Sequence, residues 1–432
     1  MNYLELIRKK RDGAELCENE IKFLVDGVAS GNIPDYQLSA FLMAAYFKGM
    51  TPHETALLTD SMANSGDTLD LSMFGSLSAD KHSTGGVGDK TTLIIAPTVA
   101  ALGGKVAKMS GRALGHTGGT VDKLESIPGY KCELSPANFL EQVEKIGIAV
   151  IGQSASFAPA DKSMYALRDV TATVNCAPLI ASSIMSKKLA AGSHNIVLDV
   201  KVGSGAFLRT TEEAYELARM MTDIGRRCNR NVRAVLTDMD KPLGNAVGNV
   251  LEVKEAIDVL RGRGPDDLRE VAVTLAGLLT AMIRGISDDE GISLARETLA
   301  SGASYEKFKE WIGTQGGDTR YITAPELFGE ASVTYEVKAE SSGYVSAMDT
   351  EAIGLASTAL GAGRVDKASK IDPLAGITLI KKTGDEVLRG ETIALLHTSS
   401  PELAENGARI FNNAVSITSS VPEKRSLIFD IV

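Results

Sequence analysis

The sequence predicts an α/β protein with a small all-helical domain, a large mixed α/β domain with a largely parallel sheet, and a β-rich C-terminal portion. Three observations predict this fold class. Apolar residues recur at helical spacing over about the first 65 residues, and short β-branched runs then alternate with helical stretches. After about residue 330, short strand-like runs are separated by Gly and Asp turns. A chain of 432 residues is expected to form more than one hydrophobic core.

The N-terminal helices are indicated by apolar spacing and by their start and stop signals. Two runs follow the i, i+3, i+4, i+7 rule and end at Gly31 and Gly49: Ile21, Leu24, Val25 and Val28, then Leu38, Phe41, Leu42 and Ala45. Residues 51–54, Thr-Pro-His-Glu, predict a further helix start, with a capping Thr, proline at the first helical position and Glu three residues after the cap.

Buried strands are predicted from about Ala79 onward, in runs rich in Val, Ile and Leu: 106–109, 148–151, 196–200 and 232–236. Helical stretches between these runs indicate crossover connections and a largely parallel sheet. Residues 161–192 interrupt the alternation with mostly helical sequence, and the pattern alone does not assign them to a domain.

The C-terminal strands are predicted at 333–337, 343–345, 377–380 and 392–396. Residues 381–390 are similar in turn rhythm to biotinyl and lipoyl carrier domains. The Glu-Ala-Met-Lys-Met type of attachment site is absent from the sequence, so we take the fold hint and reject a swinging-arm function.

Composition favours a globular enzyme over a nucleic-acid-binding or membrane protein. Hydrophobic residues make up 44% and charged residues 23%, while the net charge of −10 and the lack of a long basic run disfavour a nucleic-acid partner. No apolar run approaches the roughly 20 residues of a membrane span, and the N-terminus lacks the apolar core of a signal peptide. We expect a cytoplasmic protein whose cysteines, none spaced for zinc, are reduced: Cys17, Cys132, Cys176 and Cys228.

The most informative segment is 81–89, Lys-His-Ser-Thr-Gly-Gly-Val-Gly-Asp. Glycines let a backbone approach an anion closely, and hydroxyl and N–H groups can surround its oxygens. A helical pattern follows from about Lys90, so the segment would present an anion to a helix N-terminus, with Lys81 adding positive charge. The structural alternative is a flexible glycine-rich turn.

Several standard motifs are excluded. The sequence contains no Gly-Lys-Ser/Thr string of a Walker loop, and Leu208 replaces the third glycine of a dinucleotide fingerprint in residues 203–208. Residues 152–156 fail the nucleophile-elbow pattern at their last position, and His53 has no second histidine at position 57. These departures disfavour a nucleotidyl kinase, a dehydrogenase, an esterase and a metalloprotease.

A second glycine-rich segment, 108–125, directly follows a predicted strand. Lys108 supplies charge, and Ser110 and Thr120 supply hydroxyl groups. Ligands of open α/β sheets bind beyond the carboxyl ends of the strands. Two such loops after neighbouring strands therefore predict one phosphate pocket.

Polar side chains at helical spacing form a third group. Asp161, Tyr165 and Arg168 lie at i, i+4 and i+7, and Ser183 and Lys187 form an i, i+4 pair. Taken alone, this spacing is also typical of a solvated charged face.

Together these segments resemble the thymidine and pyrimidine-nucleoside phosphorylase family. The family pattern Ser-Gly-Arg-Gly/Ala-Leu-x-x-Thr-Gly-Gly-Thr-x-Asp-x-Leu-Glu is matched without a break by residues 110–125. The resemblance covers almost the whole chain, and its motifs are long and specific. Its other matching segments are 81–89, 159–162, 165–169, 182–188 and 361–364.

The resemblance implies three structural parts: a helical domain on the base side (1–65 plus 161–192), an α/β domain on the phosphate side (79–160 plus 193–330), and a C-terminal portion (331–432). It also implies a homodimer whose domains close over the substrates. Such closure would exclude water and favour phosphate as the attacking group.

The implied reaction is the reversible phosphorolysis of uridine, thymidine and deoxyuridine to free base and α-D-(deoxy)ribose 1-phosphate, a pentosyl transfer used in nucleoside salvage. The substrates expected are a pyrimidine nucleoside and inorganic phosphate. The expected phosphate contacts are Lys81, Ser83, Thr92, Lys108, Ser110 and Thr120. The expected base contacts are Arg168, Ser183 and Lys187, and the catalytic residues are expected to be His82, Arg168 and Lys187.

This assignment gives a consistent chemistry. Phosphate attacks as the C–N bond breaks, which inverts the anomeric carbon, and negative charge develops on the pyrimidine carbonyl oxygens. Arg168, Lys187 and His82 can stabilise that charge where it develops. An acid role for His82 is expected unless its surroundings shift its titration, and no metal is needed for this step.

The resemblance also implies a structural K⁺, held in some relatives by main-chain carbonyls and one glutamate. The matching positions are Gly88, Leu243, Ala246 and Glu255. Some cation-binding relatives have Thr where this chain has Lys90, whose ammonium would either weaken the site or point away from it.

Lys108 favours a broad specificity, because thymidine-restricted relatives often have Met at that position. A thymidine-restricted phosphorylase remains an alternative. A phosphoribosyltransferase similar to anthranilate phosphoribosyltransferase would share the architecture, but would need room for pyrophosphate and metal-binding carboxylates. A non-catalytic nucleoside- or phosphate-binding regulator is the third alternative, and it would be expected to have lost residues such as His82 or Arg168.

Overall fold

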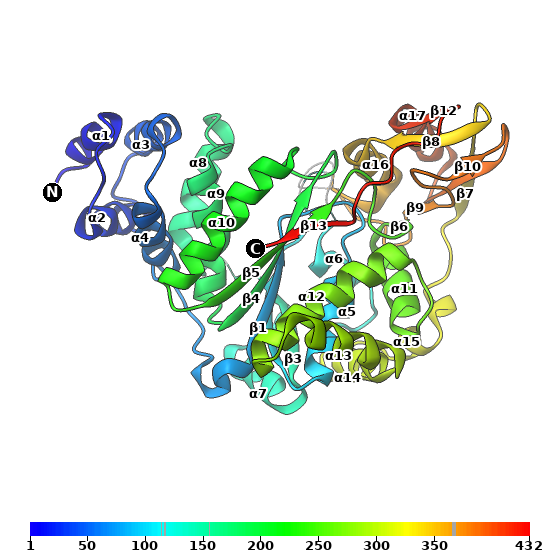
Figure 1. The fold of residues 1–432 in the computed structure, drawn as a ribbon, viewed down its shortest axis with the longest axis horizontal. Helices are drawn as coiled ribbons and strands as arrows, with labels where there is room; N and C mark the ends of the chain where they lie inside the picture. Colours follow the sequence, from blue (N-terminus) through cyan, green and yellow to red (C-terminus); the bar gives the residue numbers. More distant parts are fainter. Residues whose placement is uncertain (114, 116–117, 155, 365–368) are drawn as a thin grey trace.

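The structure is a computed structural model that describes residues 1–113, 115, 118–154, 156–364 and 369–432. Leu114, His116 and Thr117 of the second glycine-rich segment lie outside the described residues. The fold has a helical unit, an α/β unit with a mostly parallel sheet and a strand-rich C-terminal unit, as the sequence predicts (Figure 1).

The helical unit begins with α1 (Tyr3–Arg11), α2 (Glu18–Ala29), α3 (Asp35–Lys48) and α4 (Pro52–Ala63). The start predicted at residues 51–54 is confirmed. The Thr51 hydroxyl accepts from the Glu54 N–H at 3.1 Å, and the Glu54 carboxylate accepts from the Thr51 N–H at 2.9 Å. Glu54 is fully buried and also accepts from the Lys10 ammonium at 2.8 Å, which ties α1 to α4.

Two helices from the middle of the chain complete this unit: α8 (Pro159–Val170) and α9 (Ala177–Ala190). Ala160, Met164 and Leu179 belong to the same hydrophobic core as α1–α4. Further along α9, Met185 instead packs against the main sheet and α10. Since α9 contacts both cores, it links the helical unit to the sheet.

The main sheet has the order β13-β5-β4-β1-β2-β3, and its five strands other than β13 run parallel. These five are β1 (Ser78–Ser83), β2 (Lys105–Ser110), β3 (Ile148–Gly152), β4 (Asn195–Val202) and β5 (Asn231–Asp238). Strands β2 to β5 confirm the four runs predicted from the sequence. Strand β1 was not predicted as a strand, because its sequence, Ser-Ala-Asp-Lys-His-Ser, is almost entirely polar.

Both faces of this sheet are covered by helices. In β4, Ile196 and Leu198 point toward α9 and α10, whereas Val197 between them packs into the core of α5 and α12. This alternation is the two-residue period of a strand buried on both faces. The helices around the sheet are α5 (Thr92–Ala101), α6 (Thr120–Glu125), α7 (Pro136–Ile146), α10 (Thr211–Arg227), α11 (Asn249–Leu260), α12 (Asp266–Arg284), α13 (Asp288–Ala300), α14 (Ala303–Thr314) and α15 (Arg320–Thr323).

The C-terminal unit contains two small antiparallel sheets, ordered β10-β8-β12 and β6-β9-β11-β7. Four of its strands confirm the predicted runs: β7 (Val333–Lys338), β8 (Gly343–Met348), β9 (Gly376–Leu379) and β11 (Thr392–Thr398). Its other elements are α16 (Thr350–Ser357), the helical turn η3 (Thr358–Ala362), β10 (Glu386–Val387), α17 (Pro401–Ala414) and β12 (Val415–Thr418).

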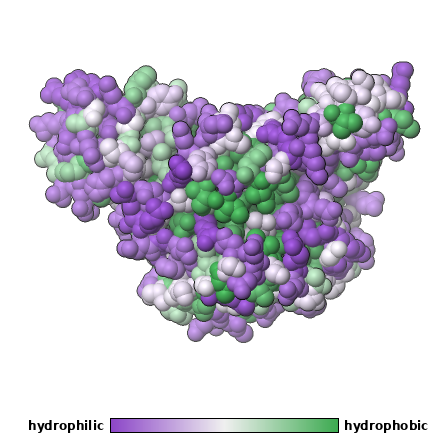
Figure 2. Space-filling view, viewed as in Figure 1, coloured by the Kyte–Doolittle hydropathy of each residue, from purple (hydrophilic) through white to green (hydrophobic). Residues whose placement is uncertain are grey.

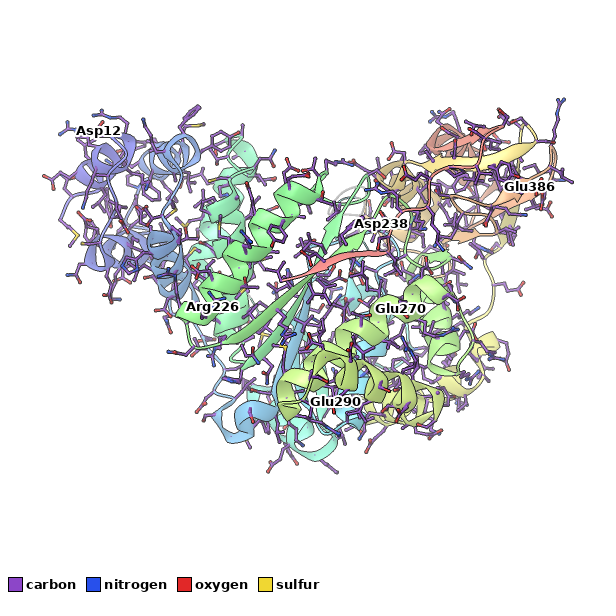
Figure 3. The ribbon with its side chains drawn as sticks, in the orientation of Figure 1. Asp12, Arg226, Asp238, Glu270, Glu290 and Glu386 are labelled. Atoms are coloured by element: carbon purple, nitrogen blue, oxygen red, sulfur yellow. The ribbon has the colours of Figure 1, made fainter. Side chains whose placement is uncertain are left out.

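Two strands cross between the α/β unit and the C-terminal unit. Strand β6 (Ala246–Val247) pairs with β9, and the last strand, β13 (Ile428–Ile431), returns to pair antiparallel with β5. Asp12 and Glu386 lie at opposite ends of the molecule, with Asp238 of β5 between them (Figure 3). Hydrophobic residues gather in the middle of the face shown in Figure 2, over β13.

Among the described residues, no single helix is long and apolar enough to cross a membrane. Helices α12 and α13 pass that test only as a pair, and they are bent by 119° at their junction.

Candidate active site

Three predicted site residues lie on β1, the inner strand between β4 and β2. Lys81, His82 and Ser83 pair in parallel register with residues 197–199 of β4. The segment 81–89 is therefore a strand end followed by a glycine-rich loop, and not a loop throughout. The carboxyl ends of parallel strands are where ligands of α/β sheets bind.

The Lys81 ammonium is buried among oxygens that β4 and the segment after β1 supply. It donates to the Thr91 hydroxyl at 2.6 Å and lies 3.5 Å from carboxylate oxygens of both Asp89 and Asp199. Asp199 also pairs with Lys201 at 2.8 Å, and both of these side chains are fully buried. Two lysines and two aspartates thus share one buried cluster, which fixes the position of Lys81.

Asp89 remains ionised in this cluster. Its burial would raise the pKa of the carboxyl, but Lys81 and Lys201, with hydrogen bonds from Ser83 and Thr91, hold that pKa well below its usual range. The hydroxyl of Ser83, a predicted phosphate contact, is therefore turned toward Asp89 in this structure.

Lys108 belongs to a second buried cluster. Its ammonium lies 3.3 Å from Asp80 and donates to the main-chain oxygen of Lys81, while Lys188 of α9 pairs with the other Asp80 oxygen at 2.7 Å. Burial lowers the pKa of Lys108 to about 8, with Lys188 and Lys81 acting in the same direction and Asp80 opposing them. Lys108 and Lys81, predicted from separate segments, are thus brought together.

His82 is half-buried where the sheet and α9 meet. Burial lowers the pKa of its imidazole well below the ordinary value, and the ammonium groups of Lys188, Lys108, Lys81 and Lys187 act in the same direction. The acid role was expected only if the surroundings of His82 left its titration unshifted, and here they lower its pKa. A neutral imidazole still has one N–H that can donate a hydrogen bond.

The remaining predicted phosphate contacts lie at element ends. Ser110 is the last residue of β2, Thr92 is the buried first residue of α5, and Thr120 is the first residue of α6. The Val121 N–H donates to the Gly111 main-chain oxygen at 3.4 Å, which brings the start of α6 next to the end of β2. A cavity of about 550 Å³ opens beside Ser110, between the carboxyl ends of β2 and β3.

Asp122 in α6 holds the second glycine-rich loop in place. Its carboxylate accepts from the Ala113 N–H at 2.6 Å and from the guanidinium of Arg112 at 3.3 Å. Arg364, from the 361–364 motif of the C-terminal unit, reaches the same carboxylate at 3.2 Å. Asp122 and Arg364 belong to motifs that the sequence analysis identified, although no role was predicted for either.

Arg168, a predicted base contact, is buried at the junction of α8 and α9. Its guanidinium donates to the main-chain oxygens of Thr173 at 3.2 Å, Val174 at 2.6 Å and Leu179 at 3.0 Å. These bonds use one hydrogen of each nitrogen and leave one hydrogen on each terminal nitrogen for another acceptor. Arg168 therefore fixes the α8–α9 connection in addition to its predicted role.

Lys187 and Ser183, the predicted pair on α9, are in contact. The Lys187 ammonium donates to the Ser183 hydroxyl at 3.1 Å and to its main-chain oxygen at 3.0 Å. It also pairs with the buried Asp161 carboxylate of α8 at 2.5 Å. Because Lys187 also acts on the pKa of His82, the helical side of the candidate site meets the sheet side at this histidine.

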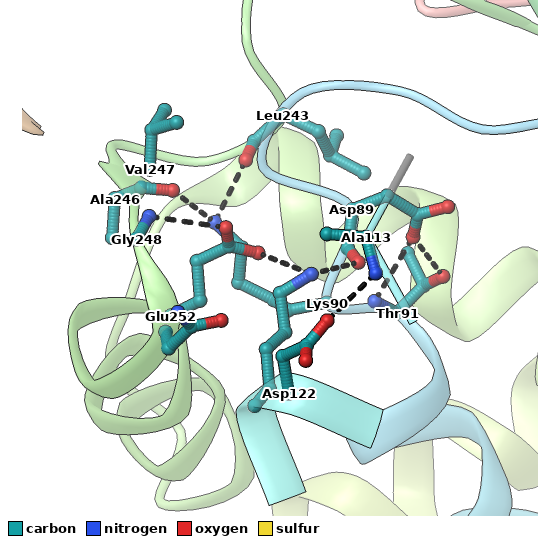
Figure 4. A network of polar contacts seen from close by, with 12 residues as sticks. Asp89, Lys90, Thr91, Ala113, Asp122, Leu243, Ala246, Val247, Gly248 and Glu252 are labelled. Carbon is teal, nitrogen blue, oxygen red and sulfur yellow. Dashed lines mark hydrogen bonds and ion pairs between the residues drawn. The ribbon is translucent and has the colours of Figure 1, made fainter. Parts of the chain in front are cut away.

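The four residues expected to hold a cation also converge. Gly88 has a φ of 73°, and a Cβ there would lie 2.5 Å from the Leu243 main-chain oxygen and 3.3 Å from that of Ala246. Glu255 accepts from the Ala246 N–H at 3.2 Å. The Lys90 ammonium lies among these oxygens and donates to three of them, so the donor set already holds a positive charge (Figure 4).

Four site residues were not identified from the sequence: Asp80, Lys188, Asp199 and Lys201. One signal for them was available. Asp199 and Lys201 are the only charged residues of β4, which is otherwise apolar apart from Asn195. Since charges enter a buried strand only when they are paired, such a strand indicates a buried ionic cluster.

Comparisons with known proteins agree with this architecture. Residues 4–66 match a family model described as the helical bundle domain of a glycosyl transferase family, and residues 76–305 match that family's α/β domain. Residues 344–418 match the C-terminal domain of pyrimidine nucleoside phosphorylases. A solved anthranilate phosphoribosyltransferase from Thermus thermophilus shares the fold, with a TM-score of 0.59 and 22% identity over 72% of this chain and 98% of that one.

Curated relatives are similar over nearly the whole length. A pyrimidine-nucleoside phosphorylase of Staphylococcus haemolyticus is 52% identical over 92% of both chains. One of Geobacillus stearothermophilus is 47% identical over 100% of this chain and 99% of that one. The chain therefore belongs to the pyrimidine-nucleoside phosphorylase family of glycosyl transferases.

Proposed function

We propose that the chain catalyses the reversible phosphorolysis of pyrimidine nucleosides, in which inorganic phosphate replaces the base on the anomeric carbon of the sugar. The observation that carries this proposal is the meeting of ammonium groups around His82, from the sheet (Lys81 and Lys108) and from α9 (Lys187). Phosphate and the departing base both carry negative charge. An arrangement with positive charge on two sides of one histidine is suited to both.

On the phosphate side, we assign the anion to the carboxyl ends of β1 and β2. Lys81 and Lys108 supply positive charge there, and Thr92 adds a hydroxyl group at the N-terminus of α5. The remaining proposed phosphate contacts are the hydroxyl groups of Ser83, Ser110 and Thr120. A net charge of −10 would otherwise repel a dianion, so this local charge is needed.

On the base side, we assign the pyrimidine to Arg168, Ser183 and Lys187. As the C–N bond breaks, the base gathers negative charge on its carbonyl oxygens, which Lys187 and the remaining N–H groups of Arg168 can stabilise. We assign to His82 the role of a neutral hydrogen-bond donor to a base carbonyl. Attack by phosphate on the face opposite the base inverts the anomeric carbon.

Base release from uridine and from thymidine, measured with and without phosphate, tests the proposal. We expect phosphate-dependent release from both substrates, and a large loss in Lys187→Ala. Lys145→Ala, an exposed lysine of α7, is the matched control and should remain active. Release from thymidine alone would indicate a thymidine-restricted enzyme, and no release from either nucleoside would contradict the proposal.

Lys187→Ala also leaves the buried Asp161 carboxylate without its cation, so the variant can lose stability as well as activity. The double variant Lys187→Ala/Asp161→Asn separates the two effects. It should recover stability, because no unpaired charge remains, while base release stays low.

We further propose that the protein is a homodimer. Large apolar side chains lie exposed at both ends of α3 and at the end of α8: Tyr36, Phe47 and Val170. Exposed apolar groups on one unit support an interaction surface there. A cytoplasmic location stays a prediction, supported by the four free thiols, and cell fractionation would test it.

A further inference from the structure

The Lys90 ammonium is fully enclosed by oxygens from two distant parts of the chain. It donates to the main-chain oxygens of Leu243 at 2.9 Å and Ala246 at 2.8 Å, and to the Glu255 carboxylate at 2.5 Å. An ammonium has three N–H donors, and all three are used here. Lys90 is about 1% exposed, so water does not compete for these bonds.

Carbonyl oxygens with one carboxylate are also the donor set expected for a monovalent cation at this place. The Glu255 carboxylate is fixed in position, because its other oxygen accepts from the Asn245 N–H at 2.8 Å. At position 88 only glycine fits, because any side chain there would collide with the Leu243 main-chain oxygen. The oxygens therefore face a space that the Lys90 ammonium already fills (Figure 4).

Charge in the surroundings is balanced without an added ion. Lys90 pairs with Glu255, Lys123 pairs with Glu252 at 3.1 Å, and the Lys382 ammonium pairs with Asp267. Each of these buried or nearly buried ammoniums has one carboxylate. A further cation among the same oxygens would face Lys90 as a like charge at close range with no carboxylate of its own, which is unfavourable in a poorly solvated site.

We infer that the Lys90 side chain takes the place of a structural monovalent cation. Its own ammonium group occupies the cation position, so the chain does not require K⁺. The bound ammonium joins the loop after β5 and helix α11 to the segment between β1 and α5. Asp89 and Thr91, the chain neighbours of Lys90, are two of the three residues that contact the Lys81 ammonium. The internal cation thereby positions the proposed phosphate loop.

Thermal unfolding and direct ion binding test this inference, and neither depends on turnover. The parent should have the same Tm in K⁺ as in choline at equal ionic strength, and should bind no stoichiometric Rb⁺ in equilibrium dialysis. Lys90→Thr removes the ammonium and supplies a hydroxyl group. It should bind about one Rb⁺ per chain and show a saturable rise in Tm with K⁺ of roughly 2–4 °C.

Two further variants make the assignment specific. Lys123→Thr removes a neighbouring buried ammonium but keeps Lys90, so it should lose stability without gaining a response to K⁺. Adding Glu255→Gln to Lys90→Thr removes the carboxylate and should abolish Rb⁺ binding.

A folded Lys90→Thr that binds no Rb⁺ would overturn the inference, as would stoichiometric Rb⁺ binding by the parent. The Tm comparison and the Rb⁺ dialysis of the parent need no variant. The inference can therefore be tested even if Lys90→Thr does not fold. The proposed phosphorolysis is judged separately by base release, so the two can fail independently.

Discussion

At the scale of single residues, neighbours decide what a side chain can do. His82 has an ordinary imidazole, yet burial and four surrounding ammonium groups lower its pKa well below the usual value. In the ligand-free protein its imidazole is therefore neutral at pH 7, which favours the proposed role of hydrogen-bond donor over that of general acid. A dianion bound close by would offset part of the positive field of these ammonium groups. The pKa of His82 should therefore depend on whether an anion is bound.

A donor role for His82 predicts a graded response to substitution. His82→Ala should reduce kcat for uridine by about 10²-fold, as expected for the loss of one donor to a developing negative charge. His82→Gln should recover part of the rate, because an amide N–H also donates.

The profile of log(kcat/KM) against pH is the second measurement on His82. Because the pKa of His82 is lowered in the folded protein, its titration should not change kcat/KM of the parent near pH 6.5. Any inflection of the profile near that pH should therefore remain in His82→Gln. An inflection that disappears in His82→Gln, together with equal inactivity of the glutamine and alanine variants, would indicate an acid role instead.

Lys108 predicts a pH dependence of phosphate binding. Burial lowers its pKa to about 8, so its positive charge is present below that pH and is lost as pH rises through it. The KM for phosphate should therefore increase above about pH 8. In Lys108→Met the KM should be high already at pH 7 and should change little between pH 7 and 9.

Phosphate itself becomes more fully dianionic over this range, so its own titration does not explain a rise in KM. A parent KM that stays constant from pH 7 to 9 would show that Lys108 does not supply charge to the anion.

The sequence could propose residues for the candidate site, because the glycine-rich segments and the α9 pair carry chemical signatures. It could not predict the direction in which a side chain points. Lys90 could equally have pointed away from the cation site, and only the folded chain brings Leu243 and Ala246 to it. The clusters around Asp80 and Asp199 likewise depend on long-range strand register.

At the scale of elements, the connection between α8 and α9 depends on one buried side chain. Arg168 donates to three main-chain oxygens of this connection. Arg168→Ala should lower the free energy of unfolding by about 1–3 kcal/mol or more, because buried acceptors lose their donor. Denaturant unfolding measures this loss.

Arg226→Ala is the matched control for Arg168→Ala. Arg226 is exposed at the end of α10 (Figure 3), and its loss should change stability by no more than about 0.5 kcal/mol. Equal stability of the two variants would contradict a structural role for Arg168. In that case any loss of activity in Arg168→Ala would be due only to a lost contact with the substrate.

Apolar periodicity predicted the elements well where side chains are apolar, as in α2, α3 and β4. It failed at β1, whose residues are polar yet buried. Lys81 and Asp80 can be buried there only because charged partners from β4, β2 and α9 neutralise them. These partners are distant in sequence, so a window along the chain contains no signal for this strand.

At the scale of the whole molecule, three of the ties between the C-terminal unit and the α/β unit come from strand pairing and from one arginine. Strand β13 pairs with β5, β6 pairs with β9, and Arg364 reaches Asp122 beside the second glycine-rich loop. The first two ties are backbone pairings that residue composition does not reveal. Through Arg364, the C-terminal unit directly supports a loop of the candidate site.

The proposed homodimer makes a prediction about mass. Light scattering after size exclusion should give twice the 45.6 kDa of the chain. Phe47→Glu should shift the population toward monomer, because a charge would replace an exposed apolar contact on the helical unit. Leu388→Glu, at another exposed apolar position, in the C-terminal unit, is the control and should stay dimeric. A parent that elutes as a monomer would contradict the proposal.

The most direct test of the central claim is the identity and configuration of the sugar product from uridine and inorganic phosphate. Proton and phosphorus NMR of the reaction should show ribose 1-phosphate with the α configuration, formed in equal amount to uracil and only when phosphate is present. Free ribose released without phosphate would indicate hydrolysis, and a β-configured phosphate would indicate retention. Either result would contradict a single displacement by phosphate at the site built around Lys81, His82 and Lys187.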